Sequence, residues 1–413
     1  MGPRSRPVSG STGAIPSLVP ETDSTAVAGP APPAGKRARA ACTSLRLRDF
    51  RNFASIDLTM PADGVALVGP NGSGKTNLVE AIYYLELFRS FRGSPDEQLA
   101  RFGEPGFHVS GTFDVGDRAL EVGAGYLKEG RLKRVRVDGA EPERLGDALG
   151  EVGIVVFSPS DIALVAGSPS DRRRYLDIVL SLNEPGYVDA LQRYRHALRQ
   201  RNAVLRDGGR SAERLPWDDA VVQWGVPVLH ARLAWVDEYA ASFAEYCRAV
   251  GDGPGMTMRY RCTVGAPDAP DDRYRDALED NFRDALERRL RREEEMGATL
   301  VGPHRDELTL RLVRDDGQDV DLRDFGSGGQ RRTAAVALRL VEADTIRTRR
   351  EREPMVLLDD IFAELDVDRS RRLMALLADE RPGQLLVTAP KDIDLGRELP
   401  LERWGIAEGS IAA

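Results

Sequence analysis

The chain has 413 residues, enough for two or three compact lobes. Hydrophobic residues make up 41% and charged residues 30%, a composition typical of globular proteins. No apolar run is long enough to span a bilayer, which excludes an integral membrane protein. The formal net charge of −8 speaks mildly against DNA binding without excluding it, because binding depends on local basic patches.

The cysteines indicate the compartment. They have neither metal-ligand spacing nor an even disulfide framework, so we expect reduced thiols and a cytoplasmic location. The three are Cys42, Cys247 and Cys262.

Residues 1–43 differ from the rest of the chain. They are rich in Pro, Gly, Ser and Ala, contain no aromatic residue and end in the basic cluster Lys36, Arg37 and Arg39. Such a segment cannot bury enough apolar surface to offset its ordering entropy, so we predict a disordered tail without a signal peptide. The basic cluster is compatible with a DNA contact or with a solvated tail, and a start codon assigned too far upstream would also explain the segment.

Ordered structure is expected to begin at Ser44, because leucines and arginines alternate up to residue 48 as in a half-buried strand. A second strand over residues 65–68 leads into a glycine-rich loop, and residues 77–88 have a helical period. Further strands are predicted at 106–113, 120–126, 135–137 and 154–157.

The pattern changes after residue 171. Apolar residues recur at helical spacing over 187–205, over 217–250 with an interruption at Pro227, and over 278–290. We predict an inserted helical lobe over residues 172–300, far too short for the long coiled-coil arms of chromosome-organising proteins. Residues 301–413 then return to an α/β pattern, beginning with a strand over 308–312.

The glycine-rich loop after the second strand matches the Walker A pattern GxxxxGK[ST] in full. Glycines allow backbone N–H groups to converge on phosphate oxygens, and the helix that follows adds its positive dipole end. We therefore predict a nucleotide site formed by Gly69, Pro70, Asn71, Gly72, Ser73, Gly74, Lys75 and Thr76. Lys75 is expected to reach the β- and γ-phosphates, and the Thr76 hydroxyl is expected to bind Mg²⁺.

Residues 355–360 form a short apolar strand that ends in two carboxylates, a Walker B pattern. We expect Asp359 to hold Mg²⁺ and Asp360 to orient or deprotonate the attacking water. Paired acids at a strand end also occur in solvated turns, but the upstream Walker A motif favours the catalytic interpretation. Residues 44–171 and 301–413 are thus predicted to be the two parts of one α/β ATPase lobe.

A second glycine-rich helix start precedes the Walker B strand. It resembles the ABC signature LSGGQ, with Gly326 in place of the leading leucine, and comprises Ser327, Gly328, Gly329 and Gln330. In ABC ATPases these residues contact the γ-phosphate held by a second subunit. A flexible turn is the alternative, and the position upstream of Walker B favours the signature.

Residues 363–366 resemble a D-loop, with Glu364 and Asp366 at the expected dimer interface. At the next strand, Thr388 stands where ABC transporters carry a switch histidine. This departure argues against a transporter ATPase and agrees with the DNA-repair branches.

Several stretches outside these motifs resemble the RecF family of ABC/SMC-like ATPases. The resemblance runs in continuous order from residue 44 to the C-terminus, and Gly-Pro-His-Arg-Asp at 302–306 is among its more selective motifs. The similar stretches are 45–53, 80–85, 89–92, 157–161, 167–177, 302–306 and 358–366. In the 45–53 stretch the resemblance implies that Arg51 and Asn52 lie at the nucleotide.

The resemblance implies a two-lobed head that forms a homodimer on ATP, sandwiching each nucleotide between one Walker A motif and the other chain's signature. Such dimers bind gapped, single-strand and duplex DNA at junctions and, with RecO and RecR, promote recombinase loading; hydrolysis releases the dimer. We expect a weak, DNA-stimulated ATPase, since Asp360 is one methylene shorter than the usual Glu and Ser327 would come from the partner.

Arg172, Arg173 and Arg174 form the densest basic run of the ordered part, a candidate DNA contact or else a solvated or ion-paired helix start. His304, in the 302–306 stretch, is expected to join the two lobes rather than to bind a metal. Two other functions stay open: an SMC-like structural ATPase, disfavoured by the short insertion, and a transporter ATPase, disfavoured by Thr388.

Overall fold

The computed structural model describes residues 37–412, apart from 117, 209–210, 252, 266–273, 315–316, 381 and 392–400. Most of the predicted disordered tail lies outside these residues, but its boundary at residue 43 is wrong. Strand β1 (Ala38–Arg39) pairs in parallel with β12 (Arg352–Glu353), and β2 (Ala41–Phe50) follows at once. The small side chains of Ala40 and Cys42 are fully buried, a fit that depends on partners more than 300 residues away in the chain.

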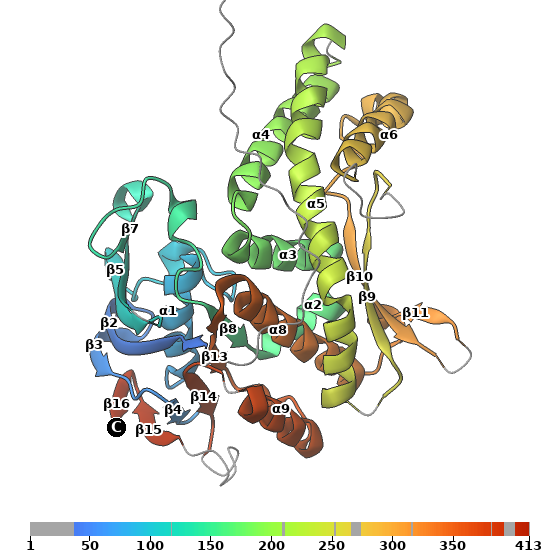
Figure 1. Ribbon diagram of the computed structural model, residues 1–413. Helices are drawn as coiled ribbons and strands as arrows, with labels where there is room; N and C mark the ends of the chain where they lie inside the picture. The colour runs from blue at the N-terminus through green and yellow to red at the C-terminus, as the bar shows by residue number, and fades with distance from the viewer. Residues whose placement is uncertain are drawn as a thin grey trace, which may run out of the picture. The chain divides into compact units, whose positions relative to one another are not determined.

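A six-stranded sheet forms the centre of the ATPase lobe (Figure 1), and its strands are parallel except β16. The apolar runs predicted at 65–68 and 154–157 are two of its strands, and near-continuous apolar sequence is typical of strands buried on both faces. The order is β16 (Ser410–Ala412), β15 (Glu402–Ala407), β4 (Gly64–Val68), β14 (Leu385–Ala389), β13 (Met355–Leu358) and β8 (Ile154–Phe157).

Helices cover both faces of this sheet. Helix α1 (Lys75–Leu87) shares one core with alternate strand residues such as Leu67 and Leu357. The other alternate residues, such as Ala66 and Leu358, pack against α8 (Gly328–Arg350) and α9 (Val367–Glu380). The carboxyl end of β4 leads through the Walker A loop into α1, and the carboxyl end of β13 leads into the two Walker B acids.

A five-stranded antiparallel sheet covers α1 on its other side (Figure 1). The strands at 106–113, 120–126 and 135–137 were predicted, whereas β3 was missed because its side chains are only partly buried. The order is β3 (Phe53–Thr59), β2, β5 (Gly106–Asp114), β6 (Ala119–Leu127) and β7 (Leu132–Val137). Its inner face packs on α1 and its outer face is exposed.

The inserted lobe contains more than helices, which corrects the prediction. Strand β9 (Met256–Arg261) pairs with β10 (Glu307–Val313), and β10 pairs with β11 (Asp319–Asp321). The expected boundary at residue 300 therefore separates two paired strands. The expected boundary at residue 171 lies inside helix α3 (Pro169–Asn183). The helices are α2 (Ile162–Ala166), α3 (Pro169–Asn183), α4 (Tyr187–Arg206), α5 (Ser211–Val250), α6 (Tyr274–Met296) and, before α8, α7 (Leu322–Phe325).

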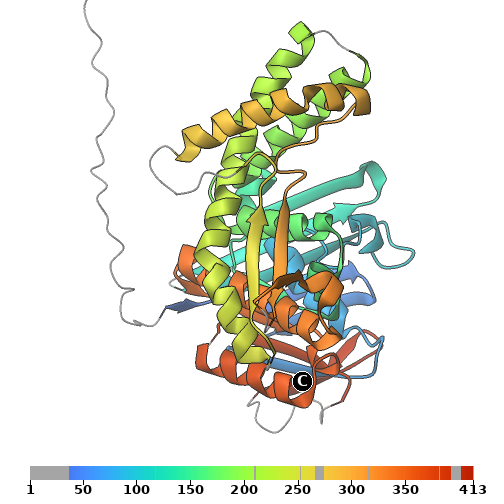
Figure 2. The same ribbon diagram turned by 90° about the vertical axis from the view of Figure 1, so that its right-hand side faces the viewer.

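Helix α5 runs without a break through Pro227, so the predicted interruption is wrong (Figure 2). A proline inside a helix removes one backbone hydrogen bond and crowds the preceding turn. Buried residues on both sides of it, including Val226 and Leu229, pack against the α6 residue Phe282, and this burial outweighs the lost bond. Within the described part of the chain, no helix is long and apolar enough to cross a membrane.

Candidate nucleotide-binding site

The Walker A loop lies at the carboxyl end of β4 and runs into α1, as the sequence predicts. Gly72 and Gly74 adopt positive φ angles of 83° and 117°. A Cβ at Gly69 would lie 2.2 Å from the carbonyl oxygen of Ile406, and one at Gly74 would lie 2.6 Å from the Asn52 amide. The glycines are therefore required by the loop itself.

Lys75 is 3% exposed, and its ammonium group is held within the loop. Its Nζ donates to the carbonyl oxygens of Gly69 at 2.9 Å and Pro70 at 3.3 Å. The Asn52 side chain, from the β2–β3 turn, donates to the Ser73 carbonyl at 3.1 Å. The structure thus places a buried cation within the loop and a supporting amide against its backbone.

Arg51 lies beside the loop, but its guanidinium group is held by a carboxylate that sequence reasoning missed. Glu80, on α1, is fully buried and accepts from Arg51 Nε and Nη2 at 2.7 and 2.8 Å. Ser90 Oγ donates to the same carboxylate, and Arg92 lies 3.8 Å from it. Glu80 follows Lys75 by five residues, and only its burial in an otherwise apolar helix face distinguishes it from a surface acid.

A hollow of about 700 Å³ opens next to Arg51 and Asn52. Phe102 lines it and is fully exposed, an unusual position for a large apolar side chain. The hollow also includes Asn77 and Arg101. Neither the hollow nor Phe102 was predicted, because the loop that carries them has no motif of its own.

The Walker B strand brings the predicted metal ligands together. The Thr76 hydroxyl donates to Asp359 Oδ1 at 2.9 Å, although the two residues are 283 positions apart. Burial raises the pKa of the Asp359 carboxyl to about 6, while the hydrogen bond from Thr76 opposes this rise. A hydroxyl and a carboxylate are oxygen ligands that fit Mg²⁺. Within the described residues, no group of three or more His, Cys, Asp or Glu side chains could hold a metal.

Thr388 connects the two Walker B carboxylates. Its Oγ1 lies 3.1 Å from Asp359 Oδ1 and 3.2 Å from Asp360 Oδ1, and it accepts from the Asp360 N–H at 2.9 Å. Asp360 has a positive φ of 48°, so its backbone turns sharply at the strand end. Thr388, at the predicted switch position, is thus in direct contact with both acids and holds them in place.

The signature residues cap helix α8. Ser327 Oγ accepts from the Gln330 N–H at 3.2 Å, and Gln330 Oε1 accepts from the Ser327 N–H at 2.7 Å. A Cβ at Gly329 would lie 2.7 Å from the Arg369 guanidinium, whereas Gly328 faces open space. The helix start therefore presents Ser327 and Gly328 to solvent.

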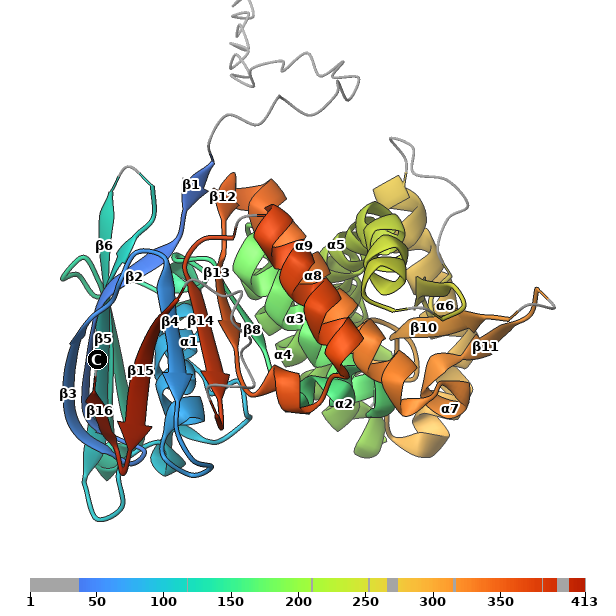
Figure 3. The same ribbon diagram turned by 90° about the horizontal axis from the view of Figure 1, so that it is seen from below.

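The D-loop lies next to this helix start. Arg332 pairs with Glu364 at 2.7 Å, and Asp366 accepts from the Arg369 N–H at 2.9 Å at the beginning of α9. Figure 3 shows α7 and the start of α8 well away from β4 and α1. The Walker motifs and the signature of one chain thus form two separate surfaces.

Of the alternatives for the basic run in α3, the structure supports an ion-paired helix start at Arg172. Arg172 is 4% exposed, pairs with Glu307 at 2.5 Å and donates to the Gly167 carbonyl. Arg173 donates to the Asp306 carbonyl at 2.9 Å. The structure contradicts a DNA contact by Arg172, because its guanidinium group is occupied within the protein; of the three, Arg174 is exposed.

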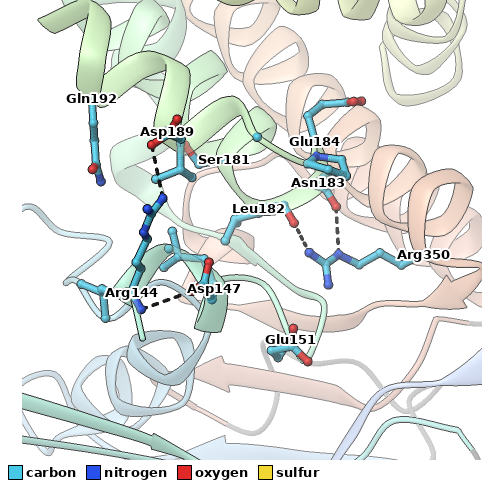
Figure 4. A pocket seen from close by; sticks show the side chains of 16 residues that line it. Arg144, Asp147, Glu151, Ser181, Leu182, Asn183, Glu184, Asp189, Gln192 and Arg350 are labelled. Carbon is cyan, nitrogen blue, oxygen red and sulfur yellow. Dashed lines mark hydrogen bonds and ion pairs between the residues drawn. The ribbon is translucent and has the colours of Figure 1, made fainter. Parts of the chain in front are cut away.

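A separate cavity of about 560 Å³ lies between residues 145–149 and the α3–α4 turn (Figure 4). Its charged side chains are engaged with neighbours: Arg144 lies 3.4 Å from Asp189, and Arg350 donates to Asn183 and to the Leu182 carbonyl. None of the nucleotide motifs lines it. This cavity is therefore separate from the predicted nucleotide site.

Comparisons with known proteins identify the family. The family model RecF/RecN/SMC N terminal domain matches residues 41–395. "DNA replication and repair protein RecF" of Salinibacter ruber is 40% identical over 361 residues, covering 84% of each chain. The protein of the same name from Frankia alni is 39% identical over 386 residues, covering 89% of this chain and 98% of its own.

Solved structures also match the chain. The recombination mediator protein RecF with ATP, in the RecFOR pathway, matches with a TM-score of 0.81 and 26% identity over 91% of this chain and 98% of its own. A Pyrococcus furiosus Smc head domain matches with a TM-score of 0.52 and 16% identity over 90% and 95%, which shows a shared fold only. The chain therefore has an ABC-type ATPase fold and belongs to the RecF family of DNA replication and repair proteins.

Proposed function

We propose that this chain binds ATP and Mg²⁺, closes into a homodimer, binds gapped or junction DNA in that state, and releases it on hydrolysis. The observation that carries the proposal is the division of the nucleotide site between two separate surfaces. One surface holds Lys75, bonded within the Walker A loop, and the hydrogen-bonded pair of Thr76 and Asp359. The other surface holds the exposed signature.

The signature surface is suited to a phosphate from another molecule. Helix α8 begins with exposed Gly328, and the capping pair of Ser327 and Gln330 fixes the direction of the helix start. Free N–H groups at a helix start, with the positive end of the helix dipole, favour an anion. Since the chain's own Walker A loop lies elsewhere, the phosphate would belong to ATP held by a second copy.

Exposed apolar side chains support a second copy at this surface. Phe325 is 66% exposed next to the signature, and Val367 is 73% exposed next to the D-loop. Phe102 is fully exposed beside the Walker A hollow. Large apolar groups at both halves of the site would lose their contact with water when two chains close over ATP.

The residues present give each step a chemical basis. Thr76 and Asp359 would hold Mg²⁺, which supplies positive charge to the β- and γ-phosphates. Asp360 would orient the attacking water, and Thr388 keeps that carboxylate in place. Hydrolysis would be slow, because the shorter Asp side chain holds water less well and the partner's Ser327 is absent from a single chain.

The partners follow from the relatives. Proteins 34% to 40% identical carry the name DNA replication and repair protein RecF, and a related solved structure is named as a recombination mediator of the RecFOR pathway. We therefore propose that this chain acts in recombinational repair and replication, with RecO and RecR as partners in recombinase loading.

The direct test measures binding to gapped, single-stranded and duplex DNA with and without ATP, together with sedimentation of the same samples. We expect ATP to induce dimers and to tighten binding most on gapped DNA. Lys75→Met should lose both effects, because the phosphates lose their buried cation. Dimers that bind no DNA would refute the DNA role while leaving the ATPase assignment standing.

A further inference from the structure

The outer face of the antiparallel sheet carries a basic pattern that no nucleotide motif explains. In the strand register Arg48 lies opposite His108, His108 opposite Gly125, and Gly125 opposite Arg134. The neighbouring row, in the same strand order, is Arg46, Ser110, Gly123 and Arg136. These eight residues, which we name the arginine face, form two rows across β2, β5, β6 and β7.

The charges of the arginine face point to solvent. All four arginines are exposed. Two of them pair with acids that lie outside the arginine face: Arg46 is 3.1 Å from Asp57, and Arg136 is 3.9 Å from Glu141. Within the described part of the chain, Arg48 and Arg134 form no ion pair. The face therefore has excess positive charge, although the chain as a whole has a formal charge of −8.

His108 lies between the arginines of β2 and β7, and its pKa responds to their positive charge. Burial lowers the pKa of its imidazole, and Arg136 and Arg48 lower it further. Arginines from β2 and β7 thus act on the same point in the middle of the sheet. Any molecule attracted to that point would carry negative charge.

The two central glycines are not required by the fold. Neither Gly123 nor Gly125 has a positive φ, and a Cβ at either position would meet no atom closer than 3.6 Å. Glycine weakens a strand interior, and often marks a place where a ligand approaches the backbone closely. Here the glycines leave a hollow of about 340 Å³ on the sheet, lined by His108, Arg134 and Arg136 and, toward one end of the sheet, by the apolar side chains of Phe107, Tyr126, Leu127 and Leu132.

We propose that the arginine face binds the sugar-phosphate backbone of duplex DNA. Three strand spacings separate the arginines of β2 from those of β7, about 14 Å at about 4.8 Å each. This separation is close to the width of the major groove, about 12 Å. The phosphates on one side of the groove would therefore lie over the two arginines of β2, and the phosphates on the other side over the two arginines of β7. The two glycines keep the centre of the face low, so that no side chain at these positions holds the duplex away from the arginines on either side.

The composition of the arginine face favours duplex over single-stranded DNA. Its two rows contain no Phe, Tyr or Trp on which unpaired bases would stack, and the aromatic residues Phe107 and Tyr126 that line the hollow are buried. Guanidinium groups on strands of a sheet are instead fixed donors for phosphate oxygens. This inference rests on the proposed DNA-binding function and gives it a contact surface, in place of the buried Arg172.

One test uses the glycines, because the structure separates their effects on folding and binding. In the variant Gly123→Thr/Gly125→Thr, threonine favours strands and the open space admits its Cβ, so the unfolding temperature should be unchanged or higher. ATP-dependent affinity for a 30-base-pair duplex should fall roughly tenfold, since the phosphates can no longer approach. A stable variant with wild-type affinity would overturn the proposal.

A second test uses salt dependence. In Arg48→Gln/Arg134→Gln, the slope of log K against log salt should shrink by about 1.8, about 0.9 for each lost phosphate contact. The matched control is Arg288→Gln/Arg291→Gln, which removes two exposed arginines from α6 and should leave the slope unchanged.

These outcomes separate the two proposals. If the wild-type protein binds ATP and no DNA, the proposed function fails. If the wild-type protein binds duplex DNA and both sets of variants bind it equally, only the arginine face is refuted. Equal losses in the α6 control would also refute it, because the effect would then follow total charge rather than this surface.

Discussion

At the scale of single residues, Thr388 is the contact that joins the two Walker B acids. Its hydroxyl lies within 3.2 Å of both carboxylates and accepts from the Asp360 N–H. Thr388→Val keeps the shape but removes these bonds. We expect ATP hydrolysis to fall roughly tenfold or more, because misplacing a reacting group is costly, while ATP affinity changes little.

The measurement is turnover at saturating ATP together with equilibrium binding of a labelled nucleotide. Thr388→Ser, which keeps the hydroxyl, should restore most of the turnover. If Val and Ser variants hydrolyse ATP equally well, the hydroxyl has no positioning role. A parallel loss of nucleotide affinity in the Val variant would instead indicate a general disturbance of the site.

His304 is a second residue with a measurable effect. Its Nδ1 accepts from the Tyr194 hydroxyl at 2.6 Å and its Nε2 lies 3.0 Å from the Thr299 carbonyl, which suits a neutral ring. Burial lowers its pKa to about 4, and the nearby arginines 305, 173 and 201 add to this effect.

The sign of the pH effect follows from that pKa. As the pH falls below about 6.5, the unfolded chain takes up a proton that folded His304 refuses until about pH 4. Stability is therefore lost over this window, at up to about 1.4 kcal/mol per pH unit. Urea unfolding at several pH values should show a shallower loss for His304→Gln; an unchanged slope would contradict the neutral, buried ring.

At the scale of elements, α5 and α6 meet at a contact that only glycine permits. A Cβ at Gly225 would lie 2.5 Å from the Phe282 ring and 3.1 Å from the Tyr194 ring. Gly225→Ala should therefore lower the free energy of unfolding by about 1–3 kcal/mol, despite the better helix propensity of alanine. Chemical denaturation measures this change. The matched control is Gly123→Ala, which meets nothing closer than 3.6 Å and should be neutral or stabilising.

The elements also show what local sequence can predict. The Walker A loop, the Walker B strand and most of the strands of the two larger sheets were predicted because contiguous residues determine each of them. The start of the fold at β1 was not, since its pairing partner β12 lies more than 300 residues away. Strand β9 was missed for a similar reason, because its partner β10 follows only after the whole of α6.

The candidate site divides in the same way. Phosphate-loop residues follow from their spacing, whereas the Glu80 clamp on Arg51 depends on burial that no motif encodes. The sequence left Arg172 between a DNA contact and an ion pair, because its partner, Glu307, is 135 positions away. The arginine face follows from strand register, which brings together residues from four separate strands.

At the scale of the whole molecule, the proposed function requires two chains to share each nucleotide site. The exposed side chains of Phe325 and Val367 would then be buried between chains. Phe325→Ser/Val367→Ser should weaken ATP-dependent dimers in sedimentation without lowering the unfolding temperature of the monomer. Leu215→Ser, at a side chain 54% exposed on α5, serves as the control and should leave dimerisation unchanged.

The shared site itself is tested most directly by complementation. Lys75→Met lacks a working Walker A loop but keeps its signature, and Ser327→Arg has the reverse defect. Neither variant alone can form a complete site, whereas a mixed dimer contains one. We predict that ATP turnover in an equimolar mixture exceeds that of either variant alone and rises with protein concentration. Turnover in the mixture equal to the mean of the separate rates would contradict a site built from two chains.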